Sequence, residues 1–455
     1  GIVARQIRAF GTLSFGAETL RGGMLRAAAR RALPAALARG ARRYTGHVPS
    51  STLALVYDNH GHPSKALRLR EVPVPPLGPD DVLVEMIASP VNPADLNVVE
   101  GTYPIRPGTF PAIGGNEGLG RVMRVGERVR DALATRYPTE SNNGDAFSPE
   151  SLARGAPLHV VTAEPGCGTW RAHAVIPARK LRTLQRGTEP ASVLPGASAH
   201  EPYLEELAQM SVNVQTAWRM LEDFVRLDYE QATVVLNAPM SAVGRAAIQL
   251  CKHRGVDVVA LLRPRPSHEA FAADANRLVE LGASLVLHDD GAAHRTTEAR
   301  SRLANLPPVR LALNGVGGAS CVNAASMLAR DGVVVTYGGM SKQPAGIPTG
   351  AAIFKNVAAR GFWLTRWLED RRMEEEASVH ADPSVVPWAH GSFMPPSDSA
   401  YAKGKRHAMA TECERLIRAG ALNLPTRRVG LEEAVGVIGE GASVGAGKTM
   451  IWMRE

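Results

Sequence analysis

The sequence predicts an α/β protein in which a β-rich, partly open, barrel-like domain is followed by a doubly wound parallel sheet. Up to about residue 200, short apolar strands alternate with Gly- and Pro-rich segments, which is typical of a barrel. From about residue 204, continuous apolar strands alternate with helical patterns, as in βαβ units. The 455 residues suffice for two or three domains, and 45% apolar with 21% charged residues is an ordinary globular composition.

The first 50 residues carry the net charge of the chain. They contain nine Arg, no Lys and a single acid, Glu18, so their charge of +8 equals that of the whole protein. The rest of the chain is therefore neutral, which argues against a nucleic-acid-binding surface. Residues 24–34 predict a basic amphipathic helix, and the depletion of acids is typical of a mitochondrial presequence. A basic tail on an Arg-rich protein is the alternative.

The β-rich part comes first along the chain. Its predicted strands are 53–57, 67–72 and 82–88. The second of these alternates apolar and polar side chains like a half-buried strand, and the prolines from Pro73 to Pro79 end it. Residues 131–165 and 187–200 interrupt this pattern with polar, turn-forming residues, and we expect loops there.

The second part supplies the parallel sheet. Its predicted strands are 233–237, 256–262, 284–288, 309–314 and 332–337, and its predicted helices are 205–210, 214–224, 243–254 and 271–281. Residues 233–237 form an apolar run, as expected for a strand buried on both faces. Residues 369–410 are expected to be irregular, before a helix at 411–419 and a closing strand at 449–453. No apolar run approaches the ~18 residues that a membrane-spanning helix needs.

The segment 233–244 has the pattern of a dinucleotide site. A strand runs into a turn of small residues that opens a helix, whose first backbone N–H groups can bind a pyrophosphate. Only one glycine of the usual set, Gly244, is present, so the segment alone fits an ordinary packed βα unit equally well. The candidate cofactor-binding residues of this turn are Asn237, Met240, Ser241, Ala242, Val243 and Gly244.

The end of the next strand indicates which cofactor would bind. NAD sites usually place an acid there to bind the ribose hydroxyls, whereas this chain has Arg263 and Arg265 and no acid. Two guanidinium groups suit a 2′-phosphate, which favours NADPH; arginines in a solvated loop are the alternative. Tyr337, Gly338, Gly339 and Met340 follow a later strand at the same edge of the sheet and are further candidates, although an ordinary tight turn would look the same.

Metal and hydrolytic sites find no support in the sequence. The four cysteines are scattered, and the thirteen histidines form no HExxH or similar pair, so we expect no metal. A hydrolase triad is not indicated either, because the chain lacks the GxSxG elbow that carries the nucleophilic serine.

Several motifs resemble a known family, the mitochondrial trans-2-enoyl-CoA reductases, which are zinc-free members of the medium-chain dehydrogenase/reductase superfamily. The matching stretches are 88–97, 100–103, 114–118, 168–171, 310–318, 336–344 and 360–364. The most specific are Gly-Gly-Asn-Glu-Gly at 114–118 and Thr-Tyr-Gly-Gly-Met at 336–340. Asn116 stands where zinc-containing members of the superfamily have His, in agreement with the absence of metal-binding pairs.

The resemblance implies NADPH-dependent reduction of an enoyl thioester, bound as enoyl-CoA or on an acyl carrier, in mitochondrial fatty-acid synthesis. It implies that Tyr103 donates the proton, that Asn92 and Asp95 line the site, and that Phe362 and Trp363 line the acyl pocket. From the residues alone, Tyr103 could be a packed surface aromatic, Asp95 a helix cap and Trp363 a core residue.

The resemblance also implies a domain plan and a location. We expect a presequence-like extension at 1–50, a GroES-like catalytic domain at 51–204, a Rossmann NADPH-binding domain at 205–366 and a return to the catalytic domain at 367–455. The location would be mitochondrial, in the matrix or on the matrix side of the inner membrane. The chain would form a homodimer through the edge near 359–364 or belong to a larger mitochondrial assembly.

Two other functions remain open at this point. The family usually has basic residues after Trp367, suited to the phosphates of CoA, but here the chain has Glu369 and Asp370 before Arg371 and Arg372. This departure and the long segments 131–165 and 369–410 would suit a homologue that serves as an accessory structural subunit. Another NADPH reductase, such as a quinone reductase, is the third possibility.

Overall fold

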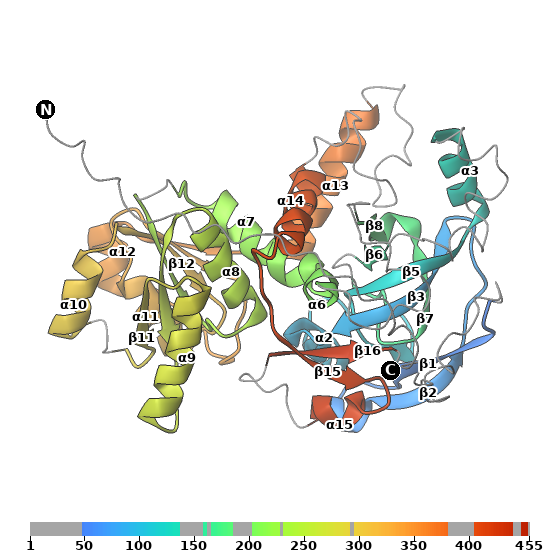
Figure 1. Ribbon diagram of the computed structural model, residues 1–455, viewed down its shortest axis with the longest axis horizontal. Coiled ribbons are helices and arrows are strands. Elements are labelled where there is room, and N and C mark those ends of the chain that lie inside the picture. The colour runs from blue at the N-terminus through green and yellow to red at the C-terminus, as the bar shows by residue number, and fades with distance from the viewer. Residues whose placement is uncertain are drawn as a thin grey trace, which may run out of the picture. The chain divides into compact units, whose positions relative to one another are not determined.

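The computed structural model describes residues 48–136, 158–161, 165–184, 203–227, 231–291, 295–380, 405–439 and 447–453 (Figure 1). Nearly all of the basic segment 1–50, including the expected helix at 24–34, lies outside the described residues. The same holds for the expected loop 187–200 and for the middle portions of 131–165 and 369–410. All described residues belong to one compact unit, Arg43–Glu455.

A six-stranded parallel sheet forms the second part of the chain. Its strands in spatial order are β11 (Leu285–His288), β10 (Asp257–Leu262), β9 (Thr233–Asn237), β12 (Val309–Asn314), β13 (Val333–Thr336) and β14 (Ala358–Gly361). The direction of winding reverses between β9 and β12. In such sheets ligands bind beyond the carboxyl ends of the strands at this point.

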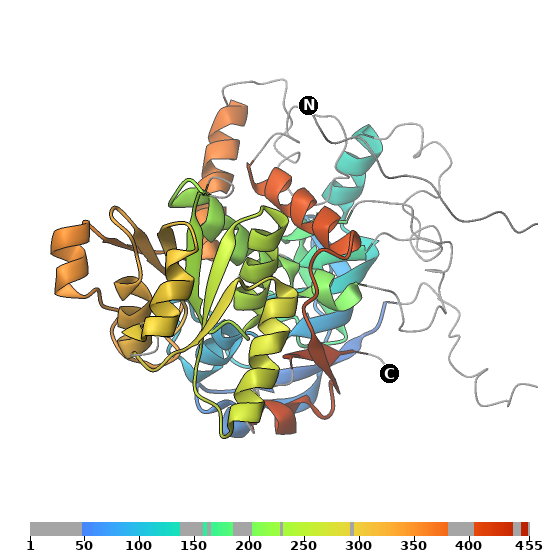
Figure 2. The same ribbon diagram turned by 60° about the vertical axis from the view of Figure 1, so that its left-hand side comes forward.

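Helices cover both faces of this sheet (Figure 1, Figure 2). They are α8 (Ala242–His253), α9 (His268–Leu281), α10 (Thr297–Ala304), α11 (Gly318–Ser326) and α12 (Thr349–Lys355). Alternate residues of β9 enter different apolar clusters: Val234 packs in the cluster that contains Ile248 of α8, and Val235 in the cluster that contains Ala324 of α11. Burial of both faces explains why β9 is an unbroken apolar run.

The remaining strands form two smaller antiparallel systems. A seven-stranded sheet contains β15 (Thr426–Gly430), β16 (Lys448–Trp452), β3 (Asp81–Pro90), β5 (Gly118–Val125), β6 (Leu158–Val161) and β8 (Leu181–Thr183) in this order, with β7 (His173–Pro177) also paired to β3. A three-stranded sheet has the order β2 (Arg68–Pro73), β1 (Ser51–Tyr57) and β4 (Ala112–Ile113). Because β16 pairs with β3, the end of the chain returns to the first part, as expected for the closing strand.

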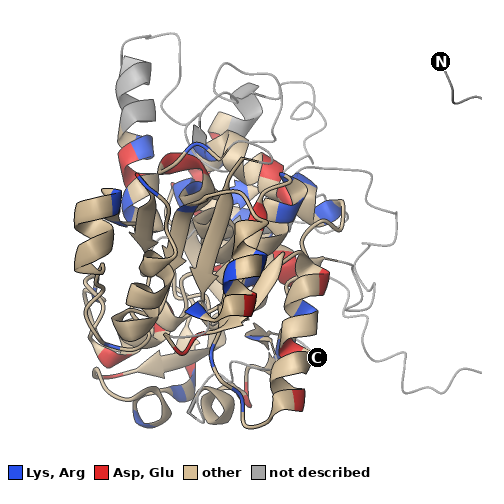
Figure 3. Ribbon diagram, turned by 90° about the vertical axis from the view of Figure 1, so that its left-hand side faces the viewer, with Lys and Arg blue, Asp and Glu red and all other residues tan. Residues whose placement is uncertain are grey.

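The remaining helices complete the described chain. They are α1 (Pro63–Ala66), α2 (Pro93–Glu100), α3 (Glu127–Arg136), a 3₁₀ turn (Ala178–Lys180), α6 (Leu204–Ala208), a π-helical turn (Met210–Val214), α7 (Gln215–Asp223), α13 (Leu364–His380), α14 (Lys405–Arg418) and α15 (Ala434–Gly439). Within the described residues, no helix combines the length and apolarity needed to cross a bilayer. Lys and Arg are interspersed with Asp and Glu in this part of the chain rather than gathered on one element (Figure 3).

The predicted strands are confirmed to within a residue or two, but two expected irregular stretches are partly wrong. Residues 369–380 continue helix α13, and α14 begins at Lys405 instead of at 411. In α13, Leu364, Trp367 and Leu368 are the apolar residues near its start, and the polar residues after them hide any helical period. The expected loop 131–165 likewise contains the end of α3 and strand β6.

Candidate active site

Two asparagines hold together the carboxyl ends of the central parallel strands. Asn237, at the end of β9, donates its amide hydrogens to Asn314 Oδ1 and Ser320 Oγ, both at 2.8 Å, and accepts the Gly315 N–H at 2.8 Å. Asn314 in turn donates to Thr336 Oγ1 at 3.0 Å and accepts the Gly317 N–H at 3.0 Å. Both side chains are fully buried. Asn237 and Asn314 together therefore shape the crevice by joining β9, β12 and β13.

The turn after β9 leaves donors at the N-terminus of α8. Ser241 is the N-cap residue, and its hydroxyl accepts the Gly244 N–H at 3.0 Å. Ala242 and Val243 form the first helical turn, and their N–H groups have no acceptor among the described residues, so they fit a pyrophosphate. A Cβ on Gly244 would lie 2.5 Å from the Ala238 carbonyl oxygen, so this glycine permits close packing of the helix on the turn.

The turn after β13 lies against this first turn. A side-chain hydrogen bond joins Tyr337 to Ser241, and burial raises the pKa of Tyr337 to about 12, so its hydroxyl stays protonated. A Cβ on Gly338 would lie 2.9 Å from the Gly315 carbonyl oxygen, whereas one on Gly339 would meet nothing within 4 Å. Met340 is 62% exposed. The structure thus brings the two predicted cofactor segments together, and their backbone and donors fit a dinucleotide.

The two arginines after β10 differ in their surroundings. Arg263 is exposed, and no partner for its side chain exists among the described residues. Arg265 donates to Asp274 Oδ2 at 2.7 Å, with both side chains only 12% exposed, and Arg277 donates to Asp274 Oδ1 at 3.0 Å. Arg263 is therefore free to bind a 2′-phosphate, while Arg265 is already held by an acid.

Tyr103 and Trp363 meet although they are 260 residues apart in the chain. The indole Nε1 of Trp363 donates a hydrogen bond to the Tyr103 hydroxyl at 2.8 Å, and the rings pack edge to face with centroids 6.1 Å apart. Burial raises the pKa of Tyr103 and the charge of Asp95 adds to this, while the hydrogen bonds from Trp363 and Thr365 act in the opposite direction. Tyr103 is half-buried and Trp363 is 39% exposed, so this pair is accessible from solvent.

Phe362 lies beside Trp363 but packs in another direction. Its ring contacts Phe224 edge to face at a centroid distance of 6.0 Å, and it joins the main apolar cluster. Of the two predicted acyl-pocket residues, Trp363 therefore lies with Tyr103, whereas Phe362 supports the core below.

Asp95 caps helix α2, which was the alternative interpretation of this residue. Its Oδ2 accepts the Asn92 backbone N–H at 2.8 Å, as in a capping box, and its Oδ1 accepts from Asn116 Nδ2 at 2.7 Å. Asn116 also accepts the Gly166 N–H at 3.1 Å. Both oxygens of Asp95 are thus engaged within the protein.

Both the nitrogen and the oxygen of the Asn92 side chain are likewise hydrogen-bonded within the protein. It donates to Glu117 Oε2 at 3.0 Å and accepts from Asn213 Nδ2 at 3.2 Å. Glu117 is completely buried, and its other oxygen accepts the Val212 N–H at 2.5 Å. Val212 and Asn213 belong to the π-helical turn, so the two contacts tie the N-terminus of α2 to that turn. The hydrogen bonds of Asn92 and Asp95 thus join α2 to the residues around it, and the expectation that these two residues line the active site stays a prediction.

Three ionisable groups in this buried network, Asp95, Glu117 and Lys448, have shifted pKa values. Burial raises the pKa of Asp95 to about 6, against the lowering effect of its hydrogen bonds and of Lys448. Burial also raises the pKa of Glu117 and lowers that of Lys448, while the attraction between these two opposite charges opposes both shifts. Glu117, Asn213 and Lys448 were not predicted as site residues. Glu117 lies in one of the quoted motifs, but Asn213 and Lys448 carry no local signal.

The described side chains include no group of three or more His, Cys, Asp or Glu placed to hold a metal ion. All four cysteines are buried, and none of them forms a disulfide.

Comparison with known proteins identifies the family. Residues 78–186 match the alcohol dehydrogenase GroES-like domain, and residues 242–379 match the family model called zinc-binding dehydrogenase. Mitochondrial enoyl-acyl-carrier-protein reductase of Caenorhabditis elegans is 37% identical over 328 residues, which are 72% of this chain and 81% of the relative. The Homo sapiens protein of the same name is 35% identical over 327 residues, 72% of this chain and 76% of its own length.

Solved structures agree with this result. Etr1p in complex with NADP and crotonyl-CoA has a TM-score of 0.64 and 26% identity, covering 88% of this chain and 99% of its own. The mitochondrial 2-enoyl thioester reductase heterodimer Etr1p/Etr2p from Candida tropicalis has a TM-score of 0.65 and 25% identity, again covering 88% of this chain and 99% of its own. A quinone oxidoreductase from Pseudomonas syringae, with a TM-score of 0.61 at 17% identity and shares of 88% and 99%, shows the common fold alone. The chain belongs to the family of mitochondrial enoyl-acyl-carrier-protein reductases, within the medium-chain dehydrogenase/reductase fold.

Proposed function

We propose that this protein reduces trans-2-enoyl thioesters with NADPH as part of mitochondrial fatty-acid synthesis. The observation that carries the proposal is the pair Tyr103–Trp363. An indole nitrogen can only donate, so Tyr103 must accept this hydrogen bond, and the bond to Trp363 does not use the phenolic proton that Tyr103 would give to substrate. A proton donor beside a dinucleotide crevice is what reduction of an activated double bond requires.

The residues divide the reaction between them. Bound NADPH would supply the hydride that adds to the β-carbon of the enoyl group. The electrons of the double bond then form the thioester enolate, and Tyr103 gives its proton to the α-carbon and is reprotonated from water. Ser241, Ala242 and Val243 would hold the pyrophosphate, and Arg263 the 2′-phosphate. Trp363 orients the phenol and offers an apolar face to the acyl chain.

Turnover of a crotonyl or hexenoyl thioester, followed by NADPH consumption, tests the proposal. We expect saturable reduction with either a CoA or an acyl-carrier thioester, and comparing the two defines the substrate. Binding of NADPH without turnover of any enoyl thioester would contradict the proposal and favour an accessory structural role. Turnover of quinones alone would favour the third possibility.

Mitochondrial localisation is part of the proposal, with the matrix as the compartment. It is supported by the names of the relatives and by the acid-depleted basic composition of residues 1–50. A reporter fused to residues 1–50 should enter mitochondria, and a diffuse cytosolic signal would contradict this assignment.

We also propose that the chain forms a homodimer. The outer edge of β14 is unpaired among the described strands, and next to it Ile353 and Phe354 of α12 are 66% and 81% exposed. An open strand edge beside exposed apolar side chains is suited to pairing with a second copy.

The domain plan is part of the same proposal: a catalytic domain at 51–204, a cofactor-binding domain at 205–366 and a return to the catalytic domain at 367–455.

A further inference from the structure

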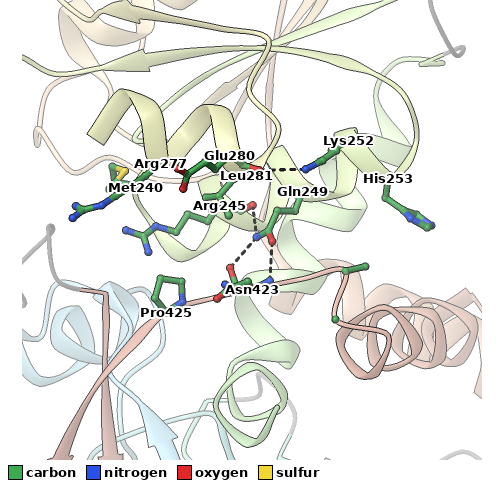
Figure 4. A pocket seen from close by; sticks show the side chains of 12 residues that line it. Met240, Arg245, Gln249, Lys252, His253, Arg277, Glu280, Leu281, Asn423 and Pro425 are labelled. Carbon is green, nitrogen blue, oxygen red and sulfur yellow. Dashed lines mark hydrogen bonds between the residues drawn. The ribbon is translucent and has the colours of Figure 1, made fainter. Parts of the chain in front are cut away.

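A cavity of about 580 Å³ lies on the flank of the parallel-sheet part (Figure 4), and of the residues assigned to the cofactor only Met240 borders it. Its lining residues are Met240, Arg245, Gln249, Lys252, His253, Arg277, Glu280, Leu281, Gly420, Ala421, Asn423 and Pro425. Helices α8 and α9 form one side, and the segment between α14 and β15 forms the other. The volume is in the range of small-molecule sites.

The wall of this cavity is fixed by hydrogen bonds. Gln249 of α8 donates to the Asn423 carbonyl oxygen at 2.9 Å and accepts the Asn423 N–H at 2.7 Å, and these bonds are visible in Figure 4. The same amide nitrogen also donates to the Arg245 carbonyl oxygen at 3.1 Å. The cavity is therefore a built feature joining two segments about 174 residues apart, and not a gap between mobile side chains.

Cationic groups dominate the lining. Arg245, Lys252 and Arg277 face one acidic lining residue, Glu280. Lys252 Nζ is bonded to the Glu280 carbonyl oxygen at 3.2 Å and leaves two further hydrogens for a ligand. The buried acid behind this wall, Asp274, is already shared between Arg265 and Arg277.

Arg245 is the residue that indicates a ligand. It is only 7% exposed, yet its Nε has no hydrogen-bond partner among the described residues, and its guanidinium group points into the cavity in Figure 4. Leaving a buried guanidinium nitrogen without a hydrogen-bond partner is costly, and an anion within the cavity would reduce that cost. Burial lowers the pKa of Arg245, the charge of Asp274 opposes this shift, and the neighbouring charge of Arg277 adds to it.

We propose that this cavity binds a phosphorylated small molecule, with Arg245 as its central anion ligand, at a site separate from the NADPH crevice. A guanidinium group binds the oxygens of a phosphate group in a bidentate manner, and Lys252 adds a point charge. Arg245 and Lys252 are seven residues apart on α8, or about 10 Å along the helix. A ligand with two phosphate groups could therefore contact both.

Binding of pyrophosphate to the full chain saturated with NADPH tests this site. Saturation fills the phosphate subsites of the cofactor, so any remaining binding belongs elsewhere. Equilibrium dialysis should give saturable binding of pyrophosphate that exceeds the effect of chloride at equal ionic strength. Arg245→Met, which keeps the length but not the charge, should weaken it by about 10-fold or more, and Lys252→Ala by a smaller factor.

Thermal unfolding provides an independent readout. In buffer without phosphate, Arg245→Met should unfold at the same temperature as the wild type or higher, because it removes a buried charged group whose Nε has no hydrogen-bond partner among the described residues. Pyrophosphate should raise the unfolding midpoint of the wild type but not that of Arg245→Met. Arg302→Met makes the same change at an exposed position of α10 and should behave like the wild type. ADP and CoA, added as competitors, distinguish a nucleotide from a thioester carrier as the source of the phosphates.

Three results would overturn the proposal. The first is no pyrophosphate binding by the NADPH-saturated wild type, and the second is unchanged binding by Arg245→Met. The third is binding that NADPH itself abolishes, which would make the cavity part of the cofactor site. None of these results depends on whether the protein reduces enoyl thioesters.

Discussion

At the residue scale, the chemistry of the site depends on which polar atoms already form hydrogen bonds within the protein. The Tyr103 oxygen accepts from Trp363 and keeps its own hydrogen, whereas the polar atoms of Asn92 and Asp95 are engaged with the protein. The sequence predicted these residues as one group, because the resemblance places them near each other. Only the hydrogen-bond partners separate a proton donor from the residues that position it.

Replacing Tyr103 by Phe tests the proton donor. Tyr103→Phe keeps the ring that packs on Trp363 and removes only the hydroxyl. Turnover of an enoyl thioester should fall by about 10²–10⁴-fold, the usual contribution of a positioned general acid. NADPH affinity, measured by titration, should be unchanged because the cofactor contacts lie on other segments. If this variant keeps wild-type turnover, water or another group must donate the proton instead of Tyr103.

The buried carboxyl group of Asp95 makes stability depend on pH. Its pKa is raised to about 6 in the folded state, against about 4 in an unfolded chain, so its favourable contribution is complete below pH 4 and is lost as the pH rises through 6. Between these values the unfolding free energy of the wild type should fall relative to that of Asp95→Asn by roughly 2–3 kcal/mol.

Chemical denaturation of both proteins across this pH range measures the difference. Asp80→Asn is the control, because the hydrogen bond from Arg128 lowers the pKa of Asp80 and the trend should have the opposite sign. A constant difference between wild type and Asp95→Asn would mean that Asp95 titrates normally.

At the scale of elements, the turn after β10 shows what local sequence can and cannot predict. The absence of an acid and the presence of two arginines were visible in the sequence, and both arginines lie after β10 as expected. Their different roles were not visible, because Asp274 is nine residues further on, within α9, and meets Arg265 only when the helix folds back.

Cofactor choice should therefore depend mainly on Arg263. Arg263→Ala should weaken NADPH binding by about 10- to 150-fold, corresponding to the loss of ~1.5–3 kcal/mol from one charge-assisted contact, and leave NADH binding nearly unchanged. Arg265→Ala should have a smaller effect on the ratio of the two affinities. Fluorescence titration with both cofactors measures this, and equal losses for NADPH and NADH in Arg263→Ala would exclude Arg263 as the phosphate ligand.

The π-helical turn is a second element whose function depends on distant residues. Its Val212 N–H is bonded to Glu117, and its Asn213 side chain to Asn92, so the segment before β9 is tied to the residues beside Tyr103. Turns of this type are frequent at functional sites. No periodicity in the sequence distinguishes this turn from the α-helices on either side of it.

Glu117→Gln should impair turnover more than cofactor binding. A carboxylate accepts both the Val212 and Asn92 hydrogens, whereas an amide can accept only one and opposes the other with a donor. We expect kcat to fall by about 10–100-fold through misplacement of the site, with NADPH affinity nearly unchanged. Glu414→Gln is the matched control: Glu414 is equally buried but pairs with Arg182 and Arg418, so it should lose stability and keep kcat. If kcat falls equally in the two variants, Glu117 contributes only to the stability of the fold and does not position the site.

At the scale of the whole molecule, five of the six strands of the parallel sheet were predictable because each is a short apolar run between turn-forming residues, whereas the edge strand β14 is mostly exposed and lacks this pattern. The antiparallel part was predictable only in outline: its seven-stranded sheet pairs β3 with β16, more than 350 residues away, and no local pattern specifies that pairing. The same limit applies to Lys448 on β16, whose charge reaches Asp95 and Glu117 through this pairing. Long-range contacts of this kind follow from the assembled core rather than from any segment.

The proposed homodimer gives the last prediction. Phe354, 81% exposed beside the open edge of β14, would become buried against a second copy, and a charge at this position would have to be buried with it. Phe354→Glu should therefore shift the protein from dimer to monomer, or raise the dissociation constant at least tenfold, as measured by sedimentation equilibrium. Val279→Glu introduces the same charge at an apolar position of α9 that is 54% exposed, and it should leave the dimer intact. If both variants remain dimeric, pairing uses another surface, and the exposed side chains of α12 must serve a different contact.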